Sequence, residues 1–359
     1  MTSALLYTET EDDLRAAVRS LLADRAEPGV LLGRIETGDP YVPGLWKSLA
    51  GEIGAAGLLV PEELGGQGAS HREAAVVLEE LGRAVIPAPY LTSAVVATET
   101  LLALDTGSAS VAELLAALAA GRTVAVLALP LSSAPGAWAP ASGPVTGVAD
   151  AAAADVLLVP RADGLYAVPA DEAGIAPQNP LDLTRPLATV TTGPGTGTRL
   201  ADAAMSTAAV ERGLLAGAGL LASEQLGLAE WCLEETVRHT RTRFQFNRPV
   251  GSFQALKHRM AQLWLEVVNA RAAARAAADA LATGSPEAPL TVAVAQAYCS
   301  KVAVHAAEEC VQLHGGIGMT WEHPAHLALK RAKSDQIALG SAGRHQDTIA
   351  ALVDLPAPV

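Results

Sequence analysis

The sequence predicts a mainly α-helical protein with a central β domain. Helical periodicity fills the first third of the 359 residues, short apolar and β-branched runs follow, and longer helical segments return after about residue 205. Half of the residues are hydrophobic, and a chain of this length can bury two or three separate cores. We therefore expect an N-terminal α-helical domain at 1–121, a small β-barrel at 122–205 and a C-terminal four-helix bundle at 206–359.

The N-terminal domain is expected to consist of successive helices. Thr10 is a candidate N-cap, because apolar residues recur after it at helical spacing. A second helix is expected between residues 46 and 57. Ser70 opens a third helix with a capping box. On that helix, Glu79 and Glu80 are expected to lie at the surface.

The middle of the chain has the texture of short strands. Apolar or β-branched runs separated by Gly, Pro and Ser lie at 123–129, 155–159 and 187–192. Because no long helical pattern separates them, a small antiparallel barrel or sandwich is favoured over a βαβ unit.

The C-terminal domain is expected to be a bundle of four long antiparallel helices. Ser206 or Thr207 can cap the first of them and Ser252 the second. The four helices are expected at about 206–241, 252–281, 289–313 and 324–339. Short breaks between long helices favour antiparallel neighbours.

Charge and hydropathy exclude several functional classes. The net charge of −13 argues against nucleic acid or an anionic membrane as a partner. The N-terminus lacks the charged-then-apolar pattern of a signal peptide. The longest uncharged stretch, Thr123 to Ala149, contains four prolines and cannot form a membrane-spanning helix. We expect a cytoplasmic protein without a membrane span.

No metal site is expected from residue spacing. The three cysteines do not have zinc-ligand spacing, and we expect them to be packed, inert thiols. Four histidines near the C-terminus also fit no metal spacing, and surface or capping positions explain them: His305, His314, His323 and His326. The Gly-Ala-Gly run that starts at Gly217 matches the residue pattern of a dinucleotide-binding fingerprint. No strand precedes it, so it is not expected to be a cofactor site.

Two motifs about 60 residues apart carry the chemical information. The first begins at Arg243, at the end of a long helix, where a guanidinium can bind a pyrophosphate or simply offset the helix dipole. The second contains Gly315 and Gly316, whose amides can approach a phosphate or simply cap a helix. In full the motifs read Arg243-Phe244-Gln245-Phe246-Asn247-Arg248-Pro249, followed by Phe253-Gln254, and Gln312-Leu313-His314-Gly315-Gly316-Ile317-Gly318.

With these motifs the chain resembles the acyl-CoA dehydrogenases, flavoenzymes that desaturate acyl thioesters between Cα and Cβ. The resemblance covers nearly the whole chain in order. Its N-terminal elements are Leu58-Leu59-Val60-Pro61-Glu62-Glu63, Gly65-Gly66-x-Gly68, Glu79-Glu80-Leu81-Gly82-Arg83 and Ala88-Pro89-Tyr90. The resemblance implies a helical domain, a β-barrel and a four-helix bundle, usually as a tetramer with FAD at subunit interfaces.

The resemblance also implies a cofactor site and reaction partners. Six residues would hold the adenine and pyrophosphate half of an FAD shared between subunits: Arg243, Phe246, Gln254, Gln312, Gly315 and Gly316. The substrate would be an acyl-CoA, and an electron-transfer flavoprotein is the usual reoxidant of the family. The acyl group, whether a fatty acid or a steroid side chain, is not specified by this sequence.

The family's catalytic base is missing from its usual position. That base is a glutamate just before a Gly-Thr or Gly-Ser pair, and counting from Gln312 places Leu339 there. Some members carry the base on the first bundle helix, where the equivalent position is Gly217. The nearest acids are Glu211 and Glu224, which are the remaining candidates.

The loop that touches the flavin ring in this family is also altered. The corresponding stretch, Leu129 to Gly136, lacks the family's acid pair. We therefore expect the base-deficient subunit of a heteromeric enzyme, resembling the α₂β₂ assemblies of actinobacterial acyl-CoA dehydrogenases, that completes a partner's FAD site. The alternatives are a self-sufficient homo-oligomer, such as a homotetramer, with a relocated glutamate, and a non-enzymatic scaffold that has lost flavin.

Overall fold

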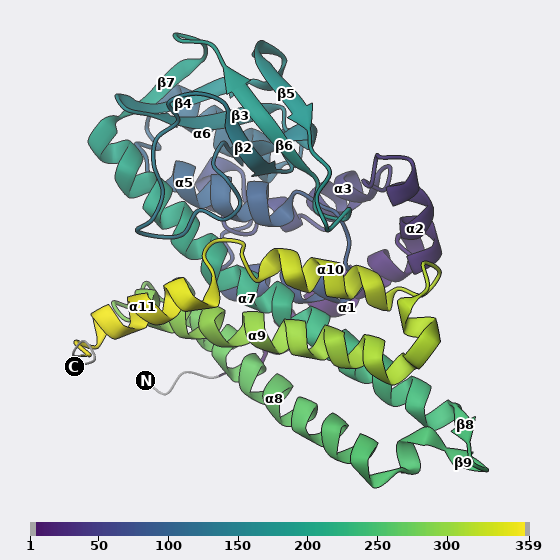
Figure 1. The fold of residues 1–359 in the computed structure, drawn as a ribbon. Helices are drawn as coiled ribbons and strands as arrows, with labels where there is room; N and C mark the ends of the chain where they lie inside the picture. The colour runs from purple at the N-terminus through teal and green to yellow at the C-terminus, as the bar shows by residue number, and fades with distance from the viewer. Residues whose placement is uncertain (1–4, 356–359) are drawn as a thin grey trace.

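The computed structural model describes residues 5–355 and contains a helical layer, a β domain and a long-helix bundle (Figure 1). The helices that precede the strands are α1 (Glu9–Arg25), α2 (Pro28–Glu36), α3 (Leu45–Lys47), α4 (His71–Ala84), α5 (Thr98–Leu102) and α6 (Ala109–Ala119). The later helices are α7 (Ala203–Thr242), α8 (Gln254–Ala282), α9 (Ala288–His314), α10 (Ala325–Asp335) and α11 (Ala342–Leu352). The predicted order of helical, β and helical parts is confirmed.

The first helices follow their capping residues. Thr8, rather than Thr10, caps α1, because Glu11 lies three residues after it and completes a capping box. The predicted capping box at Ser70 is confirmed at the start of α4. Residues 46–57 do not form one helix: α3 passes into a π-helical turn, Ser48–Glu52, and then a 3₁₀ turn, Ala55–Gly57.

Two acidic residues of α4 are buried rather than exposed. Glu79 is 1% exposed and Glu80 is 3% exposed. Helix α1 packs across α4 and brings Arg15 within 2.5 Å of Glu79 and Arg19 within 2.6 Å of Glu80. The sequence prediction of a surface position is wrong, because these arginines come from a helix more than 60 residues away.

The β domain, for which the sequence favours a small barrel or a sandwich, contains two separate hydrogen-bonded sheets. One sheet has the order β1 (Ala125–Leu127), β3 (Val156–Arg161), β4 (Gly164–Pro169) and β7 (Thr198–Asp202). The other has the order β2 (Val145–Ala149), β6 (Leu187–Thr192) and β5 (Ala173–Pro177). Strands β1 and β3 are parallel, and the remaining pairs within these two sheets are antiparallel.

Both sheets contribute to one small core. Val126 and Leu157 from the first sheet pack with Val148 and Val190 from the second. Each of these side chains is at most 2% exposed. In the described residues no strand bridges the two sheets, so the domain is a small sandwich and the barrel prediction is corrected.

The bundle is built around α7, a helix of 40 residues that packs against α4, α8 and α9. At 1.5 Å per residue it is about 60 Å long. Asp202 caps it, instead of Ser206 or Thr207. Helix α8 begins at Gln254, two residues after the predicted cap. The fourth predicted helix, 324–339, ends at Asp335, and α11 follows after a turn.

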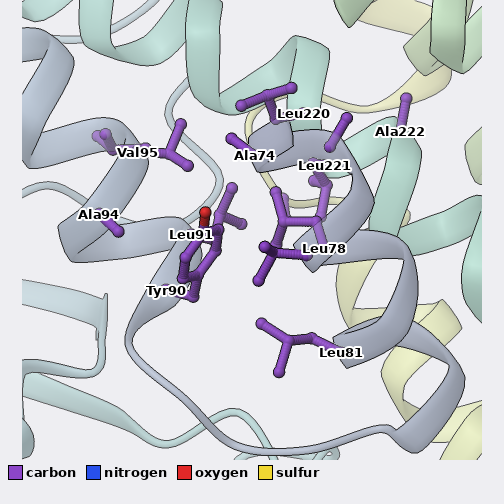
Figure 2. Close-up of a cluster of buried hydrophobic side chains, with 14 of the residues drawn as sticks. Ala74, Leu78, Leu81, Tyr90, Leu91, Ala94, Val95, Leu220, Leu221 and Ala222 are labelled. Atoms are coloured by element: carbon purple, nitrogen blue, oxygen red, sulfur yellow. The ribbon is translucent and has the colours of Figure 1, made fainter. Parts of the chain in front are cut away.

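The helical layer and the bundle share a core. Figure 2 shows Ala74, Leu78 and Leu81 of α4 facing Leu220 and Leu221 of α7, with Tyr90 beside them. Leu78 and Leu220 are at most 1% exposed. Complete burial of a leucine side chain stabilises a fold by about 1.5–3 kcal/mol, so these contacts hold α4 firmly on α7.

Two glycines allow α4 and α7 to cross at backbone contact. A Cβ at Gly82 would lie 2.1 Å from the carbonyl oxygen of Glu224, and one at Gly227 would lie 1.8 Å from that of Glu79. Both distances are far below any real contact, and both obstacles are main-chain atoms. Side chains at these two positions would therefore push the helices apart.

We predict that Gly227→Ala destabilises the protein. Overpacking costs about 1–3 kcal/mol, and here rigid backbone leaves little room to relax. As the matched control, Gly33→Ala in α2 should stabilise by about 0.5–1 kcal/mol, because a helical Ala replaces Gly and its Cβ meets nothing within 4 Å. Thermal unfolding measures both, and equal midpoints for the two variants would contradict the close crossing.

Candidate functional site

The first motif lies at the far end of the bundle from α11 (Figure 1). Arg243 is the C-cap residue of α7, is exposed, and its guanidinium makes no hydrogen bond or ion pair with a described residue. A hairpin follows, formed by β8 (Phe244–Gln245) and β9 (Arg248–Pro249). Its two turn residues, Phe246 and Asn247, have φ of 51° and 59°, which is the backbone of a tight two-residue hairpin.

Phe246 is an unusual residue for this turn. Its side chain is 87% exposed, and a bulky residue with positive φ is disfavoured. Its ring contacts Phe253 edge-on at 6.2 Å between centroids, and the Arg248 guanidinium lies 3.8 Å from the centre of the Phe253 ring. The hairpin thus projects an aromatic and cationic tip away from the bundle.

The second motif ends α9 at the same end of the bundle. Gly315 has φ of 63°, and a Cβ added at Gly315 or at Gly316 would meet nothing within 4 Å. Their backbone is therefore open to a ligand. The motifs adjoin, since the His239 ring in the last turn of α7 lies 4.2 Å from the His314 ring.

This end of the bundle fits the anionic, nucleotide half of a flavin cofactor. Arg243 supplies an uncompensated cation, and the Gly315-Gly316 turn supplies backbone without side-chain obstruction. Gln254 and Gln312, which belong to the same two motifs, are both exposed, so their side-chain amides can bond a partner. The Gly315 N–H already donates to the Gln312 carbonyl oxygen, so the exposed guanidinium and the sterically open turn, rather than that amide, would hold a pyrophosphate.

Leu339, the position predicted for the catalytic base, lies at the other side of the bundle, against the β domain. Leu339 follows α10 and adopts a left-handed backbone with φ of 53°. Its N–H donates to the carbonyl oxygen of Leu131 at 2.7 Å, and its carbonyl oxygen is 3.0 Å from Nε2 of His345. Both main-chain groups of Leu339 are therefore occupied by the fold.

The space beside Leu339 is nearly filled. A cavity of about 40 Å³ remains there, room for only a few water molecules. Pockets for small organic ligands have about 300–1,000 Å³. The lining residues are Leu91, Thr92, Val96, Val126, Leu127, Leu129, Pro130, Leu131, Ala149, Leu214 and Leu339. The cleft in this conformation fits neither a flavin ring nor an acyl chain.

Glu211, one of the two candidate bases, holds the altered loop. One carboxylate oxygen accepts from the Gly136 N–H at 2.8 Å, and the other accepts from Nε1 of Trp138 at 2.6 Å. Both oxygens are thus engaged in fixing the segment that follows the loop Leu129 to Gly136.

Glu224, the other candidate, is 2% exposed and lies in a network of buried charges. Its carboxylate pairs with Arg185 and, at 2.6 Å, with Arg331. Asp182 and Asp335 complete the network through the same two arginines. Glu224 therefore acts as a counterion between α7, α10 and the segment before β6.

The network contains three carboxyl groups and two guanidinium groups. Burial, with the neighbouring Glu224 adding to it, raises the pKa of Asp335. A protonated Asp335 would balance the remaining charges two against two. Sequence reasoning missed Asp182, Arg185, Arg331 and Asp335, because network partners lie 39 to 150 residues apart.

We predict that Arg331→Met destabilises the protein by about 3–5 kcal/mol, because removing one member of a buried ion pair leaves unpaired charge. The matched control is Lys333→Met on the same helix, whose partner Glu308 is 52% exposed. An exposed pair is worth about 0–1 kcal/mol. Chemical denaturation measures both, and similar losses for the two variants would mean that the network carries little of the stability.

Comparison with known proteins identifies the fold's family. The acyl-CoA dehydrogenase N-terminal domain matches residues 8–122, and the acyl-CoA dehydrogenase C-terminal domain matches residues 202–353. The chain belongs to the acyl-CoA dehydrogenase family. The members of this family are oxidoreductases, and the predicted resemblance is confirmed.

Curated relatives and solved structures agree with this assignment. Acyl-CoA dehydrogenase IpdE2 of Mycolicibacterium smegmatis is 36% identical over 334 residues, which cover 93% of this chain and 95% of the relative. The ChsE4-ChsE5 complex from Mycobacterium tuberculosis has a chain with a TM-score of 0.85 and 24% identity, covering 99% of this chain and 100% of that one. A variant of the Tcur3481-Tcur3483 steroid ACAD gives a TM-score of 0.85 and 26% identity, with 96% and 98% coverage.

None of the helices among residues 5–355 is both long and apolar enough to cross a membrane.

Proposed function

We propose that this chain is the base-deficient subunit of a heteromeric, FAD-dependent acyl-CoA dehydrogenase. It would complete the FAD site of a homologous partner with the end of its bundle, and the partner would supply the catalytic glutamate. The observation that carries the proposal is the contact of Leu339 with Leu131, which closes the cleft at the position where the family keeps its base.

Desaturation of an acyl-CoA requires a carboxylate within reach of the α-proton. The bound cofactor would supply the hydride acceptor for the β-hydrogen. In this chain the family position is the aliphatic Leu339. Glu211 has both oxygens bonded to the loop segment, and Glu224 is buried between two arginines. None of the three is available to take a proton from a substrate.

The residues assigned to the nucleotide half of the cofactor lie in a different environment from the candidate bases. Arg243, Phe246, Gln254, Gln312, Gly315 and Gly316 are all exposed, as residues that reach toward a neighbouring subunit must be. Phe246 is exposed although its ring is apolar, and the exposed Arg243 makes no ion pair with a described residue. They are accounted for if a partner and its FAD cover them, so we assign the six residues to the adenine and pyrophosphate half.

The heteromeric assembly is supported by the structural neighbours. Two of them are described as pairs of different chains, the ChsE4-ChsE5 complex and the Tcur3481-Tcur3483 steroid ACAD. By analogy the partner of this chain would be a second acyl-CoA dehydrogenase, in an α₂β₂ tetramer. Its substrate would be an acyl-CoA, with a steroid side chain as the first acyl group to test. An electron-transfer flavoprotein would reoxidise the enzyme's reduced flavin in the cytoplasm.

A self-sufficient homo-oligomer is the second candidate. It is favoured by the position of Glu211, which lies beside the altered loop rather than in the buried network. For Glu211 to act as base, the loop would have to release both of its oxygens and the cleft would have to open by several hundred Å³. A scaffold without flavin is the third candidate, and nothing in the exposed motifs favours it.

We predict that Arg243→Ala lowers the FAD content of the co-purified complex. Loss of a hydrogen-bonded charge costs about 1.5–3 kcal/mol, which corresponds to about a 10- to 100-fold weaker affinity. The matched control is Arg241→Ala, an exposed arginine two residues earlier at the same helix end. Equilibrium dialysis with the visible flavin spectrum measures both affinities.

Equal FAD affinity in the two variants would contradict the assignment of Arg243. A co-purified complex that contains no FAD would leave the scaffold as the better account. Retention of turnover by the complex after Glu211→Gln would support the partner's glutamate as the base, whereas its loss would favour the homo-oligomer.

A further inference from the structure

Three potential metal ligands meet at the end of the bundle. Glu235 comes from α7, His314 is the last residue of α9, and His323 lies just before α10. Their candidate ligand atoms all lie within 4.8 Å of one another. Nε2 of His314 is 3.6 Å from Oε1 of Glu235, and Nε2 of His323 is 4.0 Å from the same oxygen. Sequence spacing did not predict this cluster.

His314 is oriented as a metal-binding histidine would be. Its Nδ1 lies 2.6 Å from the carbonyl oxygen of Cys310, so Nδ1 carries the proton and donates it. This leaves the lone pair on Nε2, which has no hydrogen-bond partner although the side chain is 0% exposed. A backbone carbonyl that holds one ring nitrogen while the other faces the ion is the usual support of a metal-bound histidine.

We propose that Glu235, His314 and His323 bind one divalent transition-metal ion of the zinc type. Two imidazoles and a carboxylate are a ligand set that zinc favours. With metal–ligand bonds of about 2.0–2.2 Å, ligand atoms around a tetrahedral ion lie about 3.4 Å apart. The separations of 3.6 and 4.0 Å need only small shifts, and a solvent molecule would take the fourth position.

Two existing interactions would change on binding. Nδ1 of His323 accepts from the Ala325 N–H at 3.2 Å, and this bond would be given up, since a metal on Nε2 leaves the ring proton on Nδ1. Arg238 holds Glu235, with Nε 2.8 Å from Oε2. The Arg238 side chain is 68% exposed, so it can move into water, but it competes with the ion for the same carboxylate.

The ion would join the ends of α7 and α9 to the segment that leads into α10. Gly315 and Gly316 lie between two of the ligands in the chain, so the ion would fix the turn that they form. The inference does not depend on flavin binding, because it rests on Glu235, His314 and His323 alone.

The test is zinc binding by the purified full chain, stripped with a chelator and titrated calorimetrically with Zn²⁺. We expect one ion per chain, a higher unfolding temperature with zinc, and a tetrahedral Co²⁺ absorption spectrum. His314→Asn should weaken zinc binding by more than the roughly 10–100-fold that loss of an outer supporting group costs, because its amide can still donate to Cys310 but offers no Nε2.

Three further variants sharpen the result. His323→Asn should also weaken zinc binding, because it removes an imidazole ligand. Its amide oxygen can keep the bond from the Ala325 N–H, so the local fold should be preserved. Arg238→Gln should tighten binding, because it removes the cation that competes for Glu235. His305→Asn is the control on α9, where His305 pairs with Glu266, and it should leave zinc affinity unchanged.

Equal affinity of the unmodified chain and His314→Asn would overturn the proposal, as would weaker binding in Arg238→Gln. Absence of a stoichiometric ion in the unmodified chain would also overturn it. A variant that loses FAD from the complex but binds zinc as the unmodified chain does would show an effect on the flavin site and none on the zinc site.

Discussion

The hydrogen bond from the Leu339 N–H to the Leu131 carbonyl oxygen is the contact on which the account of this protein depends. It joins the turn after α10 to the loop that follows β1. Gly340 continues the contact, since a Cβ there would lie 2.8 Å from Cβ of Ala134. The turn after α10 and the loop after β1 therefore touch each other, and only about 40 Å³ is left beside Leu339.

Two devices keep these surfaces together. Glu211 fixes the β-domain side through Gly136 and Trp138. On the opposite side, Arg331 links α10 to Asp182 and Glu224 within the buried network, so the helix that precedes Leu339 cannot shift freely. The end of the bundle that carries the two motifs is open instead: Arg243 is exposed, and nothing lies within 4 Å of a Cβ placed on Gly315 or Gly316. One face is closed by the chain itself, and the other is exposed.

The local signals in the sequence predicted a good part of this structure. The capping box at Ser70 and the order of helical and β parts follow from neighbouring residues. The assignment of the base position to Leu339, made by counting from the Gly-Gly motif, stays a prediction. The small barrel expected for the middle domain is instead a sandwich of two sheets, because pairing between strands is a long-range property. The buried network and the meeting of Glu235 with His314 also depend on residues brought together only by the packing of α7, α9 and α10.

The most direct test of the central claim is the FAD content and reactivity of this chain purified without a partner. The chain should be dialysed against excess FAD, washed, and mixed with acyl-CoA while the visible spectrum is recorded. The closed cleft predicts no stoichiometric FAD and no bleaching until the homologous partner is added. A full complement of FAD in the isolated chain, reduced by acyl-CoA at enzyme-like rates, would contradict it.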